Sequence, residues 1–265
     1  MVLEKTKISV EWATVPHKRE LQKPNEDRVY FNEKMGLFIV LDGVTRVHQE
    51  YEIAPFTSAA GDMGDVFIDC VVRYISEHST QTNFEELLLG AVKYANTNVK
   101  AYRASKSDEE WGFYPSTLGF IGLLREDTLH YACVGDCLAV LLRKNAKILF
   151  GCEWALEALE IQQITKKERY EQYCNHPNHH LSYTVFNGDD IVEVGLEYAY
   201  IDVHADDMLL IASDGISRYL KYEKAQLLRT QTPEEMIVRS DKYDHPPYAK
   251  YADDKSVIKI AFYGE

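Results

Sequence analysis

The chain has 265 residues, of which 46% are hydrophobic and 27% are charged. This ordinary globular composition argues against disorder and leaves enough length to bury a sizeable core. The formal net charge of −13 disfavours a nucleic-acid-binding protein, because a phosphate backbone demands basic patches. The N-terminus lacks a signal-peptide pattern and no apolar stretch is long enough to span a bilayer. We therefore expect a cytoplasmic protein that does not associate with membranes.

Predicted strands and helices follow one another in separate runs. Residues 7–14 alternate between apolar and polar side chains, which predicts a half-buried strand. A second strand is predicted at residues 37–41. Two helices come next: residues 66–75 carry an apolar stripe at helical spacing, and Asn83 with Glu86 three positions later predicts the start of the second helix.

Further strands are predicted at residues 117–124, 129–134, 138–142, 208–212 and 256–262. Several are nearly continuous apolar runs, which is typical of strands covered on both faces. A later helix begins near Thr232, with Pro233 at its first position. Segregated runs of strands and helices favour an α+β fold with sheets packed between helices. No linker or repeat divides the chain, so a single domain over residues 1–265 is predicted.

Acidic residues stand beside predicted strands in four short segments, residues 25–27, 41–43, 213–215 and 252–254. A buried strand end is a poor place for a charge unless the charge is paired or binds a metal. A glycine follows both Asp42 and Asp214, where it would let the backbone turn sharply. Clusters of carboxylate oxygens suit Mg²⁺ or Mn²⁺. Two such ions would lower the pKa of a bridging water and neutralise charge on a transferring phosphoryl group.

Six motifs occur in the order found in a known family: NED (25–27) with LFIVLDG (37–43), PSTLG (115–119), CVGDCLAVLLR (133–143), LSYTVFNGD (181–189), DMLLIASDGI (207–216) and DDKSVI (253–258). Together they resemble the metal-dependent type 2C (PPM) serine/threonine protein phosphatases, with this chain as a divergent bacterial-type member. The resemblance implies a four-layer αββα sandwich of two antiparallel sheets flanked by helix pairs, with the metal ions at one end.

The resemblance also implies a set of metal ligands: Glu26, Asp27, Asp42, Gly43, Asp136, Asp214 and Asp253. By position, Asp42 would bridge two Mg²⁺ or Mn²⁺ ions. Asp42 and Asp214 would be the two residues most directly involved in catalysis. Asp253 would join Asp214 on the first ion. The second ion would take Glu26 and the Gly43 carbonyl.

Two further positions complete this set. Asp27 would hold metal-bound water. Asp136 would contribute to the third, weaker metal site that some family members have.

Two departures from the family pattern concern the substrate. The histidine that the family has after its Asp-Gly pair is absent, since Gly43 is followed by Val44. The phosphate-binding arginine that the family places before the acidic pair is absent too, and Arg46, Arg19 or Lys23 would take its role. Arg46 is favoured because it follows the metal-binding turn and arginine binds phosphate bidentately. Residues 152–187 correspond to the flap of bacterial relatives, which influences substrate choice.

The activity implied is hydrolysis of phosphoserine and phosphothreonine in a protein substrate, by direct attack of a metal-bridging water. The resemblance leaves room for a cognate serine/threonine kinase as a partner. Two alternatives stay open: a catalytically weak or inactive phosphatase-like module that binds and regulates a partner, and a metal phosphoesterase for small molecules.

Overall fold

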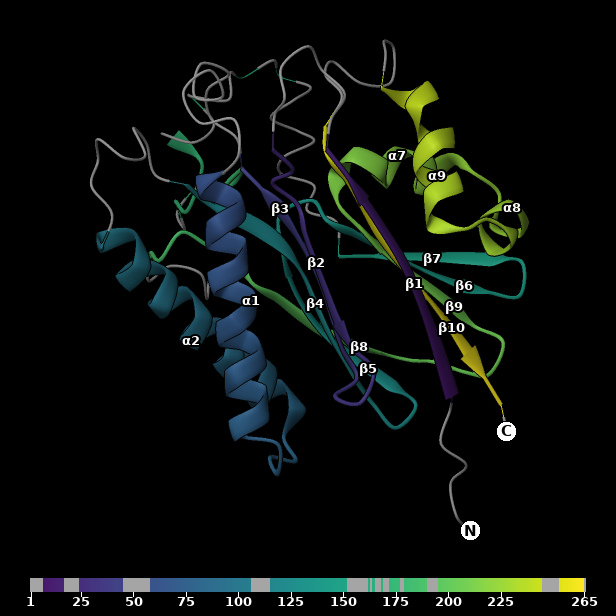
Figure 1. The fold of residues 1–265 in the computed structure, drawn as a ribbon, viewed down its shortest axis with the longest axis horizontal. Coiled ribbons are helices and arrows are strands. Elements are labelled where there is room, and N and C mark those ends of the chain that lie inside the picture. Colours follow the sequence, from purple (N-terminus) through teal and green to yellow (C-terminus); the bar gives the residue numbers. More distant parts are fainter. Residues whose placement is uncertain are drawn as a thin grey trace.

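Two five-stranded antiparallel sheets lie face to face between helices in the computed structural model of the chain (Figure 1). The structure describes residues 7–16, 24–44, 58–105, 115–151, 162, 164, 168, 172–176, 179–189, 195–244 and 253–264.

Each sheet combines strands from distant parts of the chain. Sheet I has the order β1 (Lys7–Val15), β10 (Lys255–Tyr263), β9 (Met208–Ala212), β6 (Leu138–Arg143), β7 (Ala146–Phe150). Sheet II has the order β2 (Arg28–Asn32), β3 (Leu37–Gly43), β4 (Thr117–Arg125), β5 (Thr128–Val134), β8 (Glu197–Asp202). All strands predicted from the sequence are present, and their ends shift by a residue or two.

Helices cover the outer face of both sheets (Figure 1). Two long helices lie on sheet II, α1 (Ala59–Glu77) and α2 (Phe84–Ala104). Three short helices and a 3-10 turn lie on sheet I: α7 (Asp214–Tyr222), α8 (Ala225–Thr230), α9 (Pro233–Ser240) and η2 (Asp241–Tyr243). The predicted αββα sandwich is confirmed. In the described part of the chain, three short helices stand on sheet I where a helix pair was expected. None of the described helices is long and apolar enough to cross a membrane.

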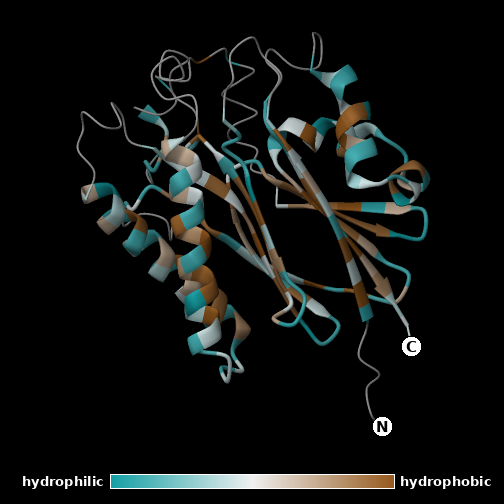
Figure 2. Cartoon of the chain, in the orientation of Figure 1, coloured by the Kyte–Doolittle hydropathy of each residue, from teal (hydrophilic) through white to brown (hydrophobic). Residues whose placement is uncertain are grey.

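The continuous apolar runs arise because each sheet has an apolar layer on both faces. In β9, Leu209 and Ile211 belong to the core between the sheets, whereas Met208, Leu210 and Ala212 pack in the core beneath α7, α8 and α9. All of these side chains are buried. Figure 2 shows hydrophobic residues along the strands and on the sides of the helices that face them. The two-sided burial was correctly read from the sequence.

Two helix starts that the sequence predicted are capped by side chains. The Asn83 side-chain oxygen accepts from the backbone N–H of Glu86 at 3.2 Å, which starts α2. Thr232 and Glu235 form a reciprocal capping box at the start of α9, with Pro233 at its first position. These caps satisfy N–H groups that have no partner within the helix.

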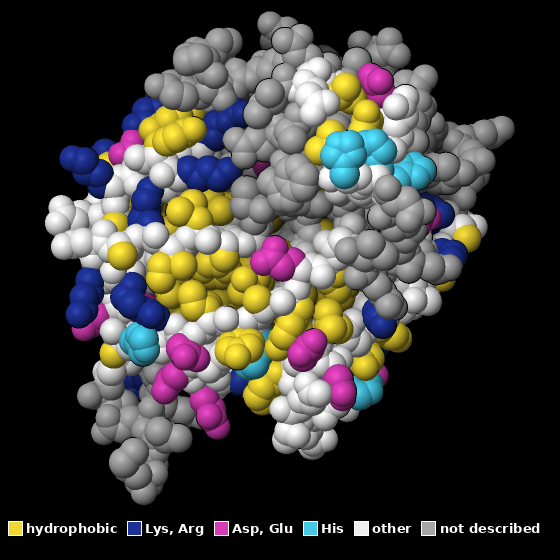
Figure 3. Space-filling view, turned by 180° about the vertical axis from the view of Figure 1, so that it is seen from behind, with side chains coloured by type: hydrophobic (Ala, Val, Ile, Leu, Met, Phe, Trp, Pro, Cys, Tyr) yellow, Lys and Arg dark blue, Asp and Glu magenta, His cyan; other side chains and the backbone are white. Residues whose placement is uncertain are grey.

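Three strands escaped the sequence pattern, and each lies at an edge of its sheet: β2, β7 and β8. Edge strands bury fewer side chains, so they lack the long apolar runs of central strands. Ile148 and Leu149 of β7 and Tyr200 of β8 remain exposed. Figure 3 shows patches of hydrophobic side chains on one face of the molecule.

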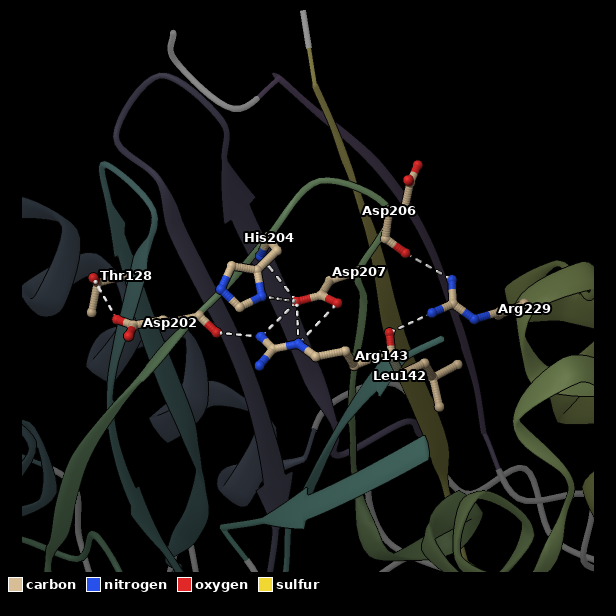
Figure 4. A network of polar contacts seen from close by, with 8 residues as sticks. All are labelled: Thr128, Leu142, Arg143, Asp202, His204, Asp206, Asp207 and Arg229. Atoms are coloured by element: carbon tan, nitrogen blue, oxygen red, sulfur yellow. Dashed lines mark hydrogen bonds and ion pairs between the residues drawn. The ribbon is translucent and has the colours of Figure 1, made fainter. Parts of the chain in front are cut away.

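A polar network joins the loop between β8 and β9 to the end of β6 (Figure 4). The guanidinium of Arg143 donates to both carboxylate oxygens of Asp207, at 3.2 Å and 2.7 Å, and to the carbonyl of Asp202 at 2.6 Å. Asp207 also accepts from the backbone N–H of His204 at 2.9 Å. Because Asp207 is buried, its charge depends on these donors.

We expect Asp207→Ala to lower the free energy of unfolding by about 2 kcal/mol, since it removes several charge-assisted hydrogen bonds from a buried carboxylate. Asp202→Ala is the matched control, because Asp202 serves Arg143 through its backbone carbonyl, which alanine keeps. It should cost less than about 0.5 kcal/mol. Urea denaturation of both variants measures this, and equal losses would contradict the account.

Candidate metal centre

Three carboxylates from distant parts of the sequence meet where β3 ends and α7 begins, at the upper end of the sandwich in Figure 1. Asp42 stands near the end of β3, Asp136 lies in the turn between β5 and β6, and Asp214 opens α7. One oxygen atom of each lies within 4.8 Å of the others. Gly135 has a φ of +77°, a left-handed conformation that glycine adopts without strain. The turn that it forms places Asp136 near Asp42 and Asp214.

The segment before β2 supplies two more acidic residues, both buried. The Ser58 hydroxyl, at the start of α1, donates to Glu26 Oε1 at 2.5 Å. The Ser213 hydroxyl, at the end of β9, donates to Asp27 Oδ2 at 2.7 Å. Each carboxylate is therefore oriented by a hydroxyl from a neighbouring element.

Asp253 and Asp254 precede β10, and their carboxylates accept hydrogen bonds from different backbone N–H groups. Asp254 is 2% exposed and its Oδ2 accepts from the backbone N–H of Glu26 at 2.8 Å. Asp253 is half-buried, and its Oδ1 accepts from the backbone N–H of Asp254 at 2.9 Å. The next residue, Lys255, is 4% exposed, and its ammonium pairs with Asp241 and Asp244 at 2.8 Å each. These two ion pairs anchor the chain directly after Asp253 and Asp254 to η2 and to Asp244, the residue that follows it.

Burial and repulsion by neighbouring carboxylates make the ionised states of Asp42 and Asp27 unfavourable in the absence of a cation. The pKa of Asp42 is raised well above its ordinary value, first by burial and then by the charges of Asp214, Asp27 and Asp253. The pKa of Asp27 is raised as well, first by burial and then by Asp254. A bound cation would offset both effects.

The two glycines that follow acidic residues act differently from the prediction of sharp turns. Gly43 lies within β3 and Gly215 within the first turn of α7, and neither has a positive φ. A Cβ on Gly43 would lie 2.5 Å from the Glu26 Cβ, and one on Gly215 would lie 2.0 Å from the Asp254 carbonyl oxygen. These glycines are needed because the acidic segments pack directly against them.

The donor set fits a hard divalent cation. The residues gathered here offer carboxylate oxygens, the ligands that Mg²⁺ and Mn²⁺ prefer. Asp42, Asp136 and Asp214 could hold one ion together, and Glu26 and Asp27 lie where they could serve a second. The resemblance assigns Asp136 to a third, weaker metal site, and the structure places one of its oxygens within 4.8 Å of oxygens of Asp42 and Asp214.

Several predicted residues lie outside the described part of the chain. They are the three candidates for phosphate binding, Arg19, Lys23 and Arg46. Much of the flap-like segment 152–187 lies outside it too. Where this segment ends, Phe186 and Thr117 exchange two backbone hydrogen bonds of 2.7 and 3.1 Å, which join it to the start of β4 beside the acidic cluster.

Histidine side chains gather on the surface in Figure 3. His176 and His180 of the flap-like segment are exposed, and the ring of His179 stacks on that of His180. Among the described residues, the group suited to a metal ion contains aspartates and no histidine.

Sequence reasoning missed the residues that hold the acidic ones in place. Ser58, Ser213 and Asp254 form hydrogen bonds to Glu26 or Asp27 across 32, 186 and 228 positions of the sequence, respectively. The sequence offered one signal, the second acidic residue of the pair at 253–254. The serines offered none, because a hydroxyl of this kind occurs at many helix and strand ends.

We expect Asp42→Asn to stabilise the metal-free protein, by an amount that grows with pH. A raised pKa in the folded state means that the folded protein binds the proton more tightly than the unfolded chain does. The stability from this proton is fully present below the ordinary pKa of 3.8 and is lost as pH rises through the raised value. Asparagine carries no such charge, so it avoids the loss.

Urea denaturation in chelator at pH 5 and pH 8 tests this expectation. The advantage of Asp42→Asn over the wild type should be larger at pH 8, and added Mn²⁺ should reverse the order by stabilising the wild type. A variant less stable than the wild type at pH 8 in chelator would contradict the electrostatic account.

Solved structures of bacterial phosphatases resemble the whole chain. The S. agalactiae serine/threonine phosphatase matches with a TM-score of 0.68 at 19% identity, covering 98% of this chain and 100% of that one. Stp1 from Staphylococcus aureus matches at 0.67 and 18%, covering 100% and 98%. The catalytic domain of PstP, solved with two manganese ions, matches at 0.64 and 17%, covering 97% and 100%.

No family model and no curated protein matches the chain. At these identities the structural likeness speaks for the architecture: the chain has the fold of the PPM-type serine/threonine phosphatases.

Proposed function

We propose that the chain is a divergent bacterial-type member of the type 2C (PPM) family and acts as a metal-dependent phosphoprotein phosphatase. The observation that carries the proposal is the meeting of Asp42, Asp136 and Asp214 at one end of this fold. The solved structure of PstP with two manganese ions supports divalent metal binding by the fold. Residues 1–265 then form a single catalytic domain with a flap-like insertion at about 152–187.

The proposed site holds two Mg²⁺ or Mn²⁺ ions. Asp42 would serve both ions. Asp214 and Asp253 would hold the first, and Glu26 and the Gly43 carbonyl would hold the second. Asp136, with an oxygen within 4.8 Å of oxygens of Asp42 and Asp214, would contribute to a third, weaker site. Such ions supply a water nucleophile near neutral pH and neutralise charge on the phosphoryl group.

The chain's own residues orient these ligands. Ser213 donates to Asp27 Oδ2 and so orients the carboxylate that would position metal-bound water. Asp254 holds the backbone at Glu26, and Ser58 fixes the Glu26 carboxylate. Because each ligand is held from a different element, a phosphoryl group would meet a preorganised cluster of charge. Arg46, or else Arg19 or Lys23, would bind the phosphate of the substrate.

The proposed substrates are phosphoserine and phosphothreonine residues in proteins, with a cognate kinase as a partner. This substrate class follows the serine/threonine phosphatases whose fold the chain shares. One observation favours a second candidate, a catalytically weak module that binds a phosphoprotein. Val44 stands where the family has a histidine. A metal phosphoesterase for small molecules would use the same carboxylates.

Hydrolysis of p-nitrophenyl phosphate and of a phosphothreonine peptide, each with Mn²⁺, Mg²⁺ or chelator, tests the proposal. We expect metal-dependent release of phosphate, with a higher kcat/KM for the peptide. Asp214→Asn should lower kcat/KM by more than about 100-fold, since loss of a residue that merely supports a ligand already costs about 10- to 100-fold. Asp202→Asn, at the other end of sheet II, is the control that should keep activity.

The other outcomes separate the candidates. Metal-dependent release from the small ester with none from the peptide would favour the small-molecule phosphoesterase. Absence of release from folded protein with either metal would favour the binding module. Full activity in Asp214→Asn would remove this residue from the proposed site.

A further inference from the structure

Arg28, directly after Glu26 and Asp27, holds these two acidic residues to helix α1. The Arg28 Nη1 donates to the backbone carbonyls of Asn25 at 2.8 Å and Asp27 at 3.0 Å. Its Nε donates to Asp65 Oδ1 of α1 at 2.7 Å. One side chain therefore joins the loop that carries Glu26 and Asp27 to α1.

Helix α1 has a surface shaped for this arginine. Gly61 and Gly64 lie one turn apart, and glycine inside a helix lowers its stability relative to alanine. A Cβ on Gly61 would lie 2.4 Å from Arg28 Nη2, and one on Gly64 would lie 3.0 Å from Arg28 Cγ. The two glycines give the guanidinium room to lie flat on the helix and reach Asp65.

The same helix end also fixes a side chain of the acidic pair. The Ser58 hydroxyl accepts from the backbone N–H of Gly61 at 3.3 Å and donates to Glu26 Oε1 at 2.5 Å. In sheet II, Arg28 pairs with Leu41, the residue before Asp42. Arg28 therefore stands where three parts of the site are fixed relative to one another: the segment with Glu26 and Asp27, the start of α1 and the end of β3.

We propose that Arg28 is a positioning residue that raises the affinity of the Glu26 side of the centre for a divalent cation by fastening residues 25–27 to α1. The inference rests on the proposed function, because it assumes that the acidic cluster binds cations. The guanidinium faces the protein rather than a substrate. Its Nε and Nη1 are bound to Asp65 and to backbone carbonyls, and the side chain is 23% exposed.

Charge alone predicts the opposite effect. A positive side chain near a cation site repels the cation, so its removal should tighten metal binding. Positioning predicts that removal loosens metal binding, because Glu26 and Asp27 lose their fixed geometry. The direction of the change therefore tells the two roles apart.

Calorimetric titration of the full chain with Mn²⁺ is the test, and it needs no substrate. The wild type should bind Mn²⁺ in two steps, and Arg28→Met should weaken the second step by about 10- to 100-fold. Arg28→Lys should weaken it as well, because an ammonium cannot donate in the fork geometry that reaches Asp65 and the two carbonyls. Gly61→Ala keeps the arginine but displaces it, so it should weaken the same step.

Arg125→Met is the matched control. Arg125 lies at the end of β4, far from the acidic cluster, and its Nη1 also donates to two backbone carbonyls, those of Met35 at 2.6 Å and Leu124 at 2.9 Å. Its loss should lower stability in urea and leave both Mn²⁺ affinities unchanged.

Unchanged or tighter second-step binding in Arg28→Met and Gly61→Ala would overturn the inference and leave the proposed function standing. A wild type that binds no Mn²⁺ would overturn the proposed function and this inference with it. If Arg28→Met does not fold, Gly61→Ala and Arg28→Lys decide the question.

Discussion

Repulsion among carboxylates at one end of the sandwich is the constraint on which the rest of the site depends. One carboxylate oxygen of each of Asp42, Asp136 and Asp214 lies within 4.8 Å of the others, and burial with the neighbouring charges raises the pKa of Asp42. Such an arrangement persists because the surrounding structure holds each group in place. Like-charged groups are held together at the expense of stability where a bound cation is to be received.

The sandwich supplies that support through its strand and helix ends. Antiparallel sheets bring the end of β3 and the starts of β2 and β10 to the same side, so residues more than 200 positions apart meet. The segment with Glu26 and Asp27 is then fixed by hydrogen bonds from the Ser58 and Ser213 hydroxyls and to the Asp254 carboxylate. The Arg28 guanidinium ties the same segment to α1. The glycines that follow Asp42 and Asp214 allow these segments to approach closely.

Much of this arrangement could be predicted from residue patterns. Central strands such as β9 were clear because both of their faces are apolar, and the acidic segments were clear because charges stand at the ends of such strands. Edge strands such as β7 were missed because they bury too little to leave a pattern. Arg28 and Ser58 were missed because their roles depend on contacts across the fold, and an arginine or serine at a strand or helix end has no distinctive spacing.

The most direct test of the account is a crystal structure grown with Mn²⁺ and measured at a wavelength where manganese scatters anomalously. We expect two anomalous peaks at this end of the sandwich, both in contact with Asp42, one beside Asp214 and the other beside Glu26. Peaks at another place, such as the exposed histidines, or no peak beside Asp42, would contradict it.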